Sequence, residues 1–177
     1  MKKRLLALFL AALLLLCGCA AEPAQETEPA ENAAPDFSFY DIEGNAHTLS
    51  ELRGKPVIPN FWASWCGPCK SEMPDLEAAY QEYGEEIHFV LVNLTDGTSE
   101  TVATASEYIA GQGYSFPVYY DISPDGTSVL AGATAYGVTA IPITYFIDAE
   151  GNVVAYASGM MSASRLQQGI DMILPEA

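Results

Sequence analysis

The chain has 177 residues and a formal net charge of −16, with 7 basic against 23 acidic side chains. Three of the basic side chains lie at positions 2–4, and their removal would leave four against 23, a net charge of −19. A surface this acidic repels nucleic-acid phosphates and anionic lipid headgroups, which excludes binding to either by charge. The length fits one domain with a short extension.

The first 18 residues have the pattern of an export signal. Basic residues 2–4 precede an apolar run at 5–16, which is shorter than the roughly 20 residues of a membrane-spanning helix. Gly18 then precedes Cys19, and this order resembles the processing site of a bacterial lipoprotein, where Cys19 would become the lipidated N-terminus. Cys17 is the weaker candidate, and ordinary secretion is the alternative.

Residues 19–35 are rich in Glu, Ala and Pro and almost lack large apolar side chains. Such a segment cannot bury enough surface to offset its chain entropy, so we expect a disordered tether. The folded domain is then expected at 36–177, a length that buries about two-thirds of the unfolded surface. Any attachment to the membrane would come from the lipid.

Hydrophobic spacing and turn residues predict the elements of this domain in chain order. Alternation at 37–42 and a turn at 43–45 predict a β-hairpin, followed by a helical turn at 50–54. The remaining elements are expected as a strand at 55–62, a helix from Cys66 to Gly84, a strand at 87–94, a helix from Thr98 or Ser99 to Gly111 or Gly113, a strand at 116–120, a helix at 129–136, a hairpin of strands at 143–147 and 153–156, and a helix capped by Ser162.

The strand at 55–62 contains Pro59, which has no N–H to donate to a neighbouring strand. We therefore expect a local bulge or an unpaired position there. The alternation of strands and helices along the chain indicates an α/β domain with helices on both faces of its sheet.

The expected folded domain holds two cysteines, Cys66 and Cys69, separated by two residues. A bridge this short closes almost no loop and stabilises little, so its value is chemical. At the start of a helix, Cys66 gains stabilisation of its thiolate and is expected near solvent as the nucleophile. Cys69 lies one turn on, as the resolving thiol. Only His47 and His88 could join them on zinc, so we expect no metal and no cofactor.

Two segments resemble the signatures of the thioredoxin superfamily. Residues 61–70, Phe-Trp-Ala-Ser-Trp-Cys-Gly-Pro-Cys-Lys, resemble its active site, and residues 137–148 resemble its cis-proline loop and the strand that follows. With the signal, the hairpin, an insert after Leu94 and the Glu72-Met73-Pro74 sequence, the chain resembles TlpA/ResA-like disulfide reductases from Asp36 onward. This implies a thioredoxin fold: a central mixed β-sheet flanked by helices, an N-terminal β-hairpin and a central αβ insert.

The resemblance also implies a substrate site around the cysteines. Pro142, preceded by Ile141, would be cis and would face Cys66, leaving nearby backbone groups free to pair with a client strand. Trp65 would shield the thiols, while Trp62 belongs to the core. With Ile141 and Pro142, the expected client-binding residues are Trp65, Gly67 and Pro68.

Two further polar residues take roles from the same resemblance. Glu72 would help to move the proton of Cys69, or would be a solvated helix carboxylate. Asn60 takes the place where many cytoplasmic thioredoxins carry a buried aspartate, which leaves the role of base to Glu72 or water.

The Gly67-Pro68 dipeptide also occurs in thioredoxin, a reductant with a potential of about −270 mV. The resemblance therefore implies reduction of disulfides in exported proteins, such as apocytochrome c, with re-reduction by a membrane thiol donor of the CcdA/DsbD type. The alternatives are a disulfide oxidase or isomerase, a thioredoxin-fold peroxidase, and a binding lipoprotein whose cysteines stay idle.

Overall fold

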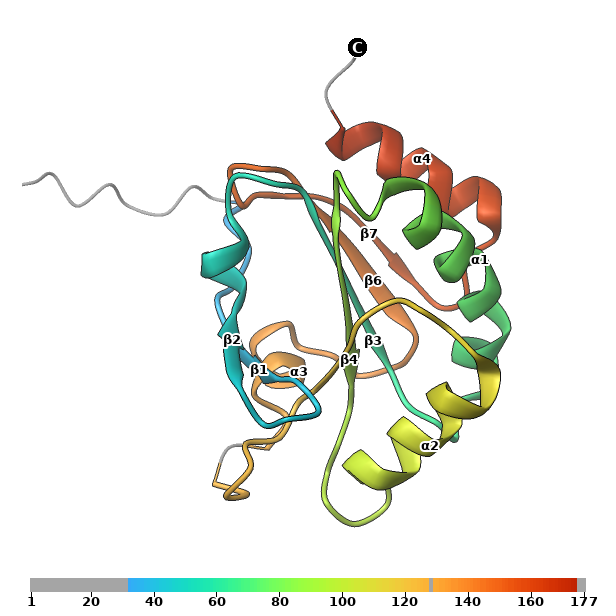
Figure 1. The fold of residues 1–177 in the computed structure, drawn as a ribbon. Helices are drawn as coiled ribbons and strands as arrows, with labels where there is room; N and C mark the ends of the chain where they lie inside the picture. The colour runs from blue at the N-terminus through green and yellow to red at the C-terminus, as the bar shows by residue number, and fades with distance from the viewer. Residues whose placement is uncertain (1–31, 128, 175–177) are drawn as a thin grey trace, which may run out of the picture.

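The computed structural model describes residues 32–127 and 129–174. This part of the chain forms a seven-stranded sheet in the order β2-β1-β5-β4-β3-β6-β7, with helices on both faces (Figure 1). The elements are β1 (Ser38–Tyr40), β2 (Ala46–Thr48), the 3₁₀ helix η1 (Leu49–Leu52), β3 (Val57–Trp62), α1 (Gly67–Tyr83), β4 (His88–Asn93), α2 (Val102–Gln112), β5 (Val118–Tyr120), α3 (Ala131–Ala135), β6 (Ile143–Ile147), β7 (Val153–Ser158) and α4 (Ala163–Ile173).

The sheet is mixed. Strands β3, β4 and β5 are parallel at its centre. On one side β6 pairs antiparallel with both β3 and β7, and on the other β1 pairs antiparallel with both β5 and β2. The predicted N-terminal hairpin, the helix after Cys66 and the hairpin of β6 and β7 are confirmed. The expected insert is α2, β5 and α3, and β5 extends the sheet beyond β4.

Successive residues of β3 point to opposite faces of the sheet and build two cores. Ile58 and Trp62 pack with residues of α1, α2 and α4 on one face. Val57 and Phe61 pack on the other face, with Phe37 and Phe39 from the N-terminal segment. Trp62 is fully buried, which confirms its expected place in the core. Because β3 is buried on both faces, the loop that follows it starts from a fixed point.

Pro59 does not shift the register of β3. On the β4 side every residue of β3 is in register, including Pro59 opposite Val90. On the β6 side pairs form at Val57, Asn60 and Phe61 but not at Ile58 or Pro59, and the register is unshifted across this gap. The unpaired position is therefore confirmed, and the alternative of a bulge is wrong.

Two helices start later than the sequence indicates. Thr98 does not open α2, because its backbone N–H and hydroxyl both donate to the Asp96 carboxylate. Thr101 caps the helix instead, accepting a hydrogen bond from the backbone N–H of Thr104 at 3.1 Å. Helix α3 begins only at Ala131, because Leu130 has a left-handed backbone with φ of 53° that cannot continue a helix.

The N-terminal limit of the folded domain also differs from the expected Asp36. The backbone of Asn32 and Ala34 already bonds to the β6–β7 turn, where Ala34 N–H donates to Gly151 O at 2.9 Å and Val153 N–H donates to Asn32 O at 2.9 Å. The last residues of the expected tether therefore belong to the domain. The expected signal at 1–18 and positions 19–31 lie outside the described residues. Among the described helices, none has the length and apolar character needed to cross a bilayer.

Gly169 in α4 offers a test of how the helix sits on the sheet. A Cβ at this position would collide with the Phe146 ring of β6. We predict that Gly169→Ala lowers the free energy of unfolding by about 1–3 kcal/mol, as overpacking does. Gly111→Ala is the matched control, since a Cβ there meets nothing within 4 Å, and it should raise stability by about 0.5 kcal/mol. Urea denaturation measures both, and an unchanged midpoint for Gly169→Ala would contradict the packing.

Candidate active site

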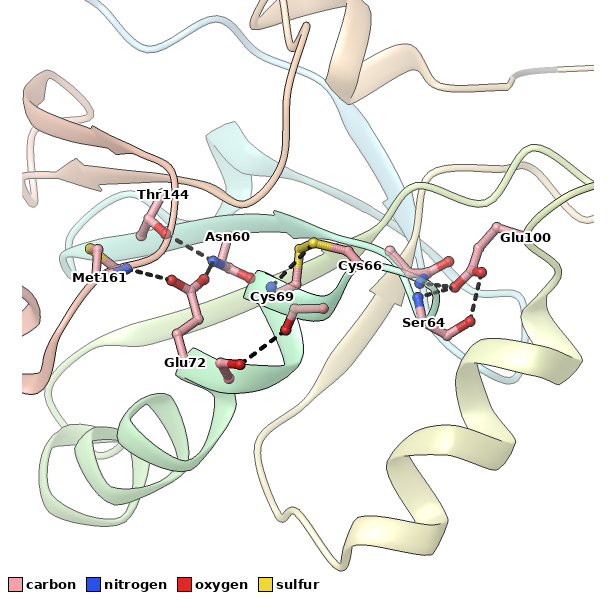
Figure 2. The surroundings of a disulfide bond; sticks show 11 residues. Asn60, Ser64, Cys66, Cys69, Glu72, Glu100, Thr144 and Met161 are labelled. Atoms are coloured by element: carbon pink, nitrogen blue, oxygen red, sulfur yellow. Dashed lines mark hydrogen bonds between the residues drawn. A yellow bond between two sulfur atoms is a disulfide. The ribbon is translucent and has the colours of Figure 1, made fainter.

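The two cysteines lie at the first turn of α1 and are joined by a disulfide, with 5.3 Å between their Cα atoms (Figure 2). Cys66 is the N-cap of the helix, and its sulfur accepts a hydrogen bond from the backbone N–H of Cys69 at 3.2 Å. Pro68 occupies the first turn, where a missing N–H leaves no hydrogen bond unmade. The predicted placement of both cysteines is therefore confirmed.

This position favours negative charge on one sulfur over the other. The N–H groups of the first helical turn have no partners within the helix, and the helix dipole adds partial positive charge at the same end. No acidic residue lies in the first turn of α1 to oppose that field. A thiolate on Cys66 would gain from both effects, so this arrangement favours Cys66 as the nucleophile and Cys69 as the resolving thiol.

The expectation that Cys66 stays near solvent is wrong for the disulfide form. Cys66 is 4% exposed, hardly more than Cys69 at 1%, because both pack into the core between β3 and α1. The exposed residues of the motif are Gly67, Pro68 and Trp65, whose side chain is 62% exposed. Trp65 therefore presents a large aromatic surface to solvent beside the cysteine pair.

The loop before β6 supplies the other side of the site. The Ile141–Pro142 peptide bond is cis, as predicted. Ile141 lines a shallow hollow of about 330 Å³ together with Trp65, Leu94 and residues 138–140. Pro142 itself is buried, and its carbonyl accepts a hydrogen bond from Gly159 N–H at 2.8 Å. The structure thus joins two of the expected client-binding residues, Trp65 and Ile141, in one apolar depression.

Glu72 is buried, 2% exposed, so the alternative of a solvated helix carboxylate is wrong. Its two oxygens accept hydrogen bonds from Asn60 Nδ2 at 2.8 Å and from the backbone N–H of Met161 at 2.9 Å. Asn60 Nδ2 also donates to Thr144 Oγ1 at 2.8 Å. Figure 2 shows the Asn60 amide between the Glu72 carboxylate and the cysteine pair.

Burial raises the pKa of Glu72 above its ordinary value of 4.5, although the hydrogen bonds from Met161 and Asn60 oppose the shift. A carboxylate with a raised pKa is a better proton acceptor near neutral pH than a solvated one. Asn60 Oδ1 is buried and has no hydrogen-bond partner among the described residues. The network can therefore take up a proton at Glu72 and accept one further hydrogen bond at Asn60.

Glu100 is a site residue that the sequence analysis missed. Its carboxylate accepts hydrogen bonds from the backbone N–H and the hydroxyl of Ser64, two residues before Cys66, each at 2.7 Å. It stands in a loop of threonine, serine, aspartate and glycine, a composition typical of solvated loops, so no sequence signal marked it. Among residues 32–127 and 129–174, no group of three or more His, Cys, Asp or Glu side chains gathers where it could hold a metal ion.

The raised pKa of Glu72 predicts a stability that depends on pH. In the disulfide form, where the cysteines do not titrate, the contribution of Glu72 is fully present below its unfolded pKa near 4.5 and is lost as the pH rises through the higher folded pKa. We predict that Glu72→Gln removes this loss, which amounts to at most about 1.4 kcal/mol per pH unit where the group titrates.

Urea denaturation of both proteins from pH 4 to pH 8 measures this difference. Glu77→Gln is the control: desolvation raises the pKa of Glu77, but hydrogen bonds from Ser115, Gln81 and Phe116 outweigh it and lower the pKa overall. Its wild-type contribution therefore changes with pH in the opposite sense. Parallel stability curves for wild type and Glu72→Gln would contradict the role of burial.

Comparison with known proteins agrees with this geometry. Residues 30–156 match the AhpC/TSA family. The thiol-disulfide oxidoreductase ResA of Halalkalibacterium halodurans is 34% identical over 145 residues, which cover 81% of this chain and 77% of that protein. Among solved structures, a putative thiol:disulfide interchange protein DsbE from Chlorobium tepidum has a TM-score of 0.65 and 30% identity, over 78% of this chain and 93% of its own.

A second solved structure comes from a surface protein. The exposed lipoprotein thioredoxin Etrx1 of Streptococcus pneumoniae has a TM-score of 0.62 and 30% identity, over 77% of this chain and 98% of its own. The cysteine pair, the cis proline and these similarities agree, and the chain belongs to the ResA-type thiol–disulfide oxidoreductases of the thioredoxin-fold AhpC/TSA family.

Proposed function

We propose that this oxidoreductase reduces disulfides of exported proteins through a Cys66/Cys69 dithiol cycle, held at the extracytoplasmic face of a bacterial membrane by a lipid on Cys19. The observation that carries the proposal is the Cys66–Cys69 pair at the N-terminus of α1, next to Trp65, which shares a hollow with Ile141 of the cis Ile141–Pro142 bond. Gly67 and Pro68 between the cysteines, as in thioredoxin, support the reducing direction.

The reaction begins when the Cys66 thiolate attacks one sulfur of a client disulfide. A Cys66–client disulfide forms, and the second client sulfur leaves as a thiolate that takes a proton from solvent. Cys69 then gives its proton to Glu72, directly or through water, and attacks the Cys66 sulfur. The Cys66–Cys69 disulfide forms, and the client sulfur that was attacked leaves as a thiolate that takes a proton from Glu72 or solvent. Two electrons thus pass from the enzyme to the client, which leaves as a dithiol.

Three groups support this sequence of steps. The helix N-terminus stabilises the attacking thiolate of Cys66. Burial raises the pKa of Glu72, which suits it to accept the proton of Cys69. Asn60 Oδ1 offers a buried acceptor to a Cys69 thiol while that thiol waits to react. A thiol donor in the membrane, of the CcdA/DsbD type, would return the electrons.

The client would bind as an extended segment along the cis-proline loop. Thr139 and Ala140 are exposed there, and the hollow shared by Trp65 and Ile141 can take an apolar side chain next to the client cysteine. The exposed faces of Gly67 and Pro68 leave room for the client backbone. Apocytochrome c is one candidate client within this class.

Cysteine variants test the direction and order of the steps. We predict that the wild-type protein catalyses reduction of insulin by dithiothreitol, that Cys66→Ser lowers the rate at least about 100-fold, and that Cys69→Ser accumulates a client on Cys66 as a mixed disulfide. The double variant, which should capture nothing, is the control. A measured potential above about −180 mV would indicate an oxidase or isomerase, and rapid consumption of hydrogen peroxide would indicate a peroxidase.

The lipid anchor has its own test. We predict that Cys19→Ser moves the protein from the membrane fraction to the soluble extracytoplasmic fraction, because one diacylated cysteine supplies the whole attachment. Cys17→Ser is the matched control and should stay with the membrane. Release by Cys17→Ser alone would place the lipid on Cys17, and retention of both variants would contradict the proposed anchor.

A further inference from the structure

A second buried carboxylate lies beside the cysteine pair, on a different segment from Glu72. Glu100, between β4 and α2, is 1% exposed. One of its oxygens accepts hydrogen bonds from Ser64 N–H and from Asn93 Nδ2, each at 2.7 Å, and the other accepts from the Ser64 hydroxyl at 2.7 Å. Figure 2 shows Glu100 and Ser64 on the side of the disulfide away from Glu72.

The residue that Glu100 holds belongs to the turn that presents Cys66. Ser64 follows β3, and the turn closes when Cys66 N–H donates to Ala63 O at 3.1 Å. Ser64 and Cys66 are two residues apart, so their Cα atoms lie within about 7.6 Å. Hydrogen bonds to both the backbone and the side chain of Ser64 fix its position and its rotation. Movement of Glu100 would therefore be passed to Cys66.

Glu100 is itself anchored from two directions. Its backbone N–H donates to Asp96 Oδ1 at 3.0 Å, and its carbonyl accepts from Asp96 N–H at 3.1 Å and Gly97 N–H at 3.0 Å. Its side chain is held by Asn93, the last residue of β4, which pairs with Trp62 at the end of β3. The sheet therefore supports the Ser64 turn from the neighbouring strand as well as from β3.

The charge of Glu100 has no cationic partner. All three donors to its carboxylate are neutral, and the single ion pair in the described part of the chain joins His47 to Asp41. A buried negative charge acts on a nearby thiolate with little screening and disfavours it. Stabilising the thiolate of a redox dithiol makes the protein more oxidising, so opposing that thiolate makes it more reducing.

We infer that Glu100 is a positioning residue for the thiol–disulfide reaction: it fixes the turn that presents Cys66, and its negative charge opposes the Cys66 thiolate and thereby favours the reducing direction. The inference deepens the proposed function and rests on Cys66 as the nucleophile. The Glu100 carboxylate bonds to Ser64 and Asn93 and to neither cysteine, so Glu100 is not assigned a direct part in the bond-breaking steps.

Two variants of the full-length protein separate position from charge. Glu100→Gln keeps the shape, since its amide oxygen can accept from Ser64 N–H and Asn93 while its amide nitrogen donates to the Ser64 hydroxyl. Glu100→Ala removes both the contacts and the charge. Glu77 provides the matched control, because it accepts hydrogen bonds from Ser115 N–H at 2.9 Å and from the Ser115 hydroxyl at 2.6 Å, on a carboxylate that contacts neither Ser64 nor the cysteines.

The effect of the Glu100 charge is measured by titrating Cys66. In a Cys69→Ser background, the rate of iodoacetamide alkylation of the Cys66 peptide is followed against pH by mass spectrometry. We expect Glu100→Gln to lower the pH of half-maximal reactivity by about one unit, and Glu77→Gln to leave it unchanged. With both cysteines present, Glu100→Gln should shift the glutathione equilibrium about two- to tenfold toward the dithiol. A shift below about 0.2 pH unit would overturn the charge role, because one full unit corresponds to a tenfold change in the ionisation equilibrium of Cys66.

The positioning role is tested by the kinetics of insulin reduction. We expect Glu100→Ala to lower kcat/KM for insulin reduction about tenfold, while Glu77→Ala keeps wild-type kinetics at a similar loss of thermal stability. Wild-type kinetics for Glu100→Ala would overturn the positioning role. If that variant does not fold, Glu100→Gln decides the inference through its kinetics and its Cys66 titration. Its kcat/KM is expected within about twofold of wild type. If the wild-type protein does not reduce insulin, the proposed function fails, while the alkylation titration still decides whether Glu100 acts on Cys66.

Discussion

The backbone N–H of Cys69 donates a hydrogen bond to the sulfur of Cys66 at the first turn of α1, and the geometry of the rest of the site depends on this contact. It places one sulfur at the positive end of a 17-residue helix and the other one turn inside it. The position holds only while the strand before it and the helix after it stay fixed. The fully buried β3 and the packing of α1 against α4 and the sheet supply that rigidity.

Two buried carboxylates, Glu72 and Glu100, lie on opposite sides of the disulfide. Glu72 belongs to α1, shares a network with Asn60 and the backbone of Met161, and is the proposed acceptor of the Cys69 proton. Glu100 belongs to the segment after β4 and holds the turn before Cys66. Burying a carboxylate is costly unless its lone pairs are satisfied, and both side chains meet that condition with neutral donors. Neutral donors leave the charge in place, so each carboxylate can act on the nearby sulfur chemistry.

The features set by residues close together in the sequence were mostly predicted correctly. The apolar spacing after Cys66 and the stop at Gly84 indicated the helix that the structure shows, and the Ile141–Pro142 signature indicated the cis bond. The sequence could not predict contacts made by backbone groups, because a donor such as Met161 N–H has no residue type to mark it, and Met161 lies 89 positions from Glu72. Glu100 was missed for a related reason: its burial depends on Ser64, 36 positions earlier, while its neighbours are polar. The solvent exposure of Cys66 was overestimated because the motif gives the order of residues but not how closely the surrounding elements pack.

The point where the chain enters the sheet lies far from the cysteine pair. Ala33 bridges to Asn152 in the turn between β6 and β7, next to the start of β3, where Val57 pairs with Ile147. Cys66 follows the far end of β3, roughly 17–20 Å along the strand. The point of chain entry and the reactive cysteines therefore lie at opposite ends of β3, so the lipid anchor proposed above would attach at the end of the domain away from Cys66.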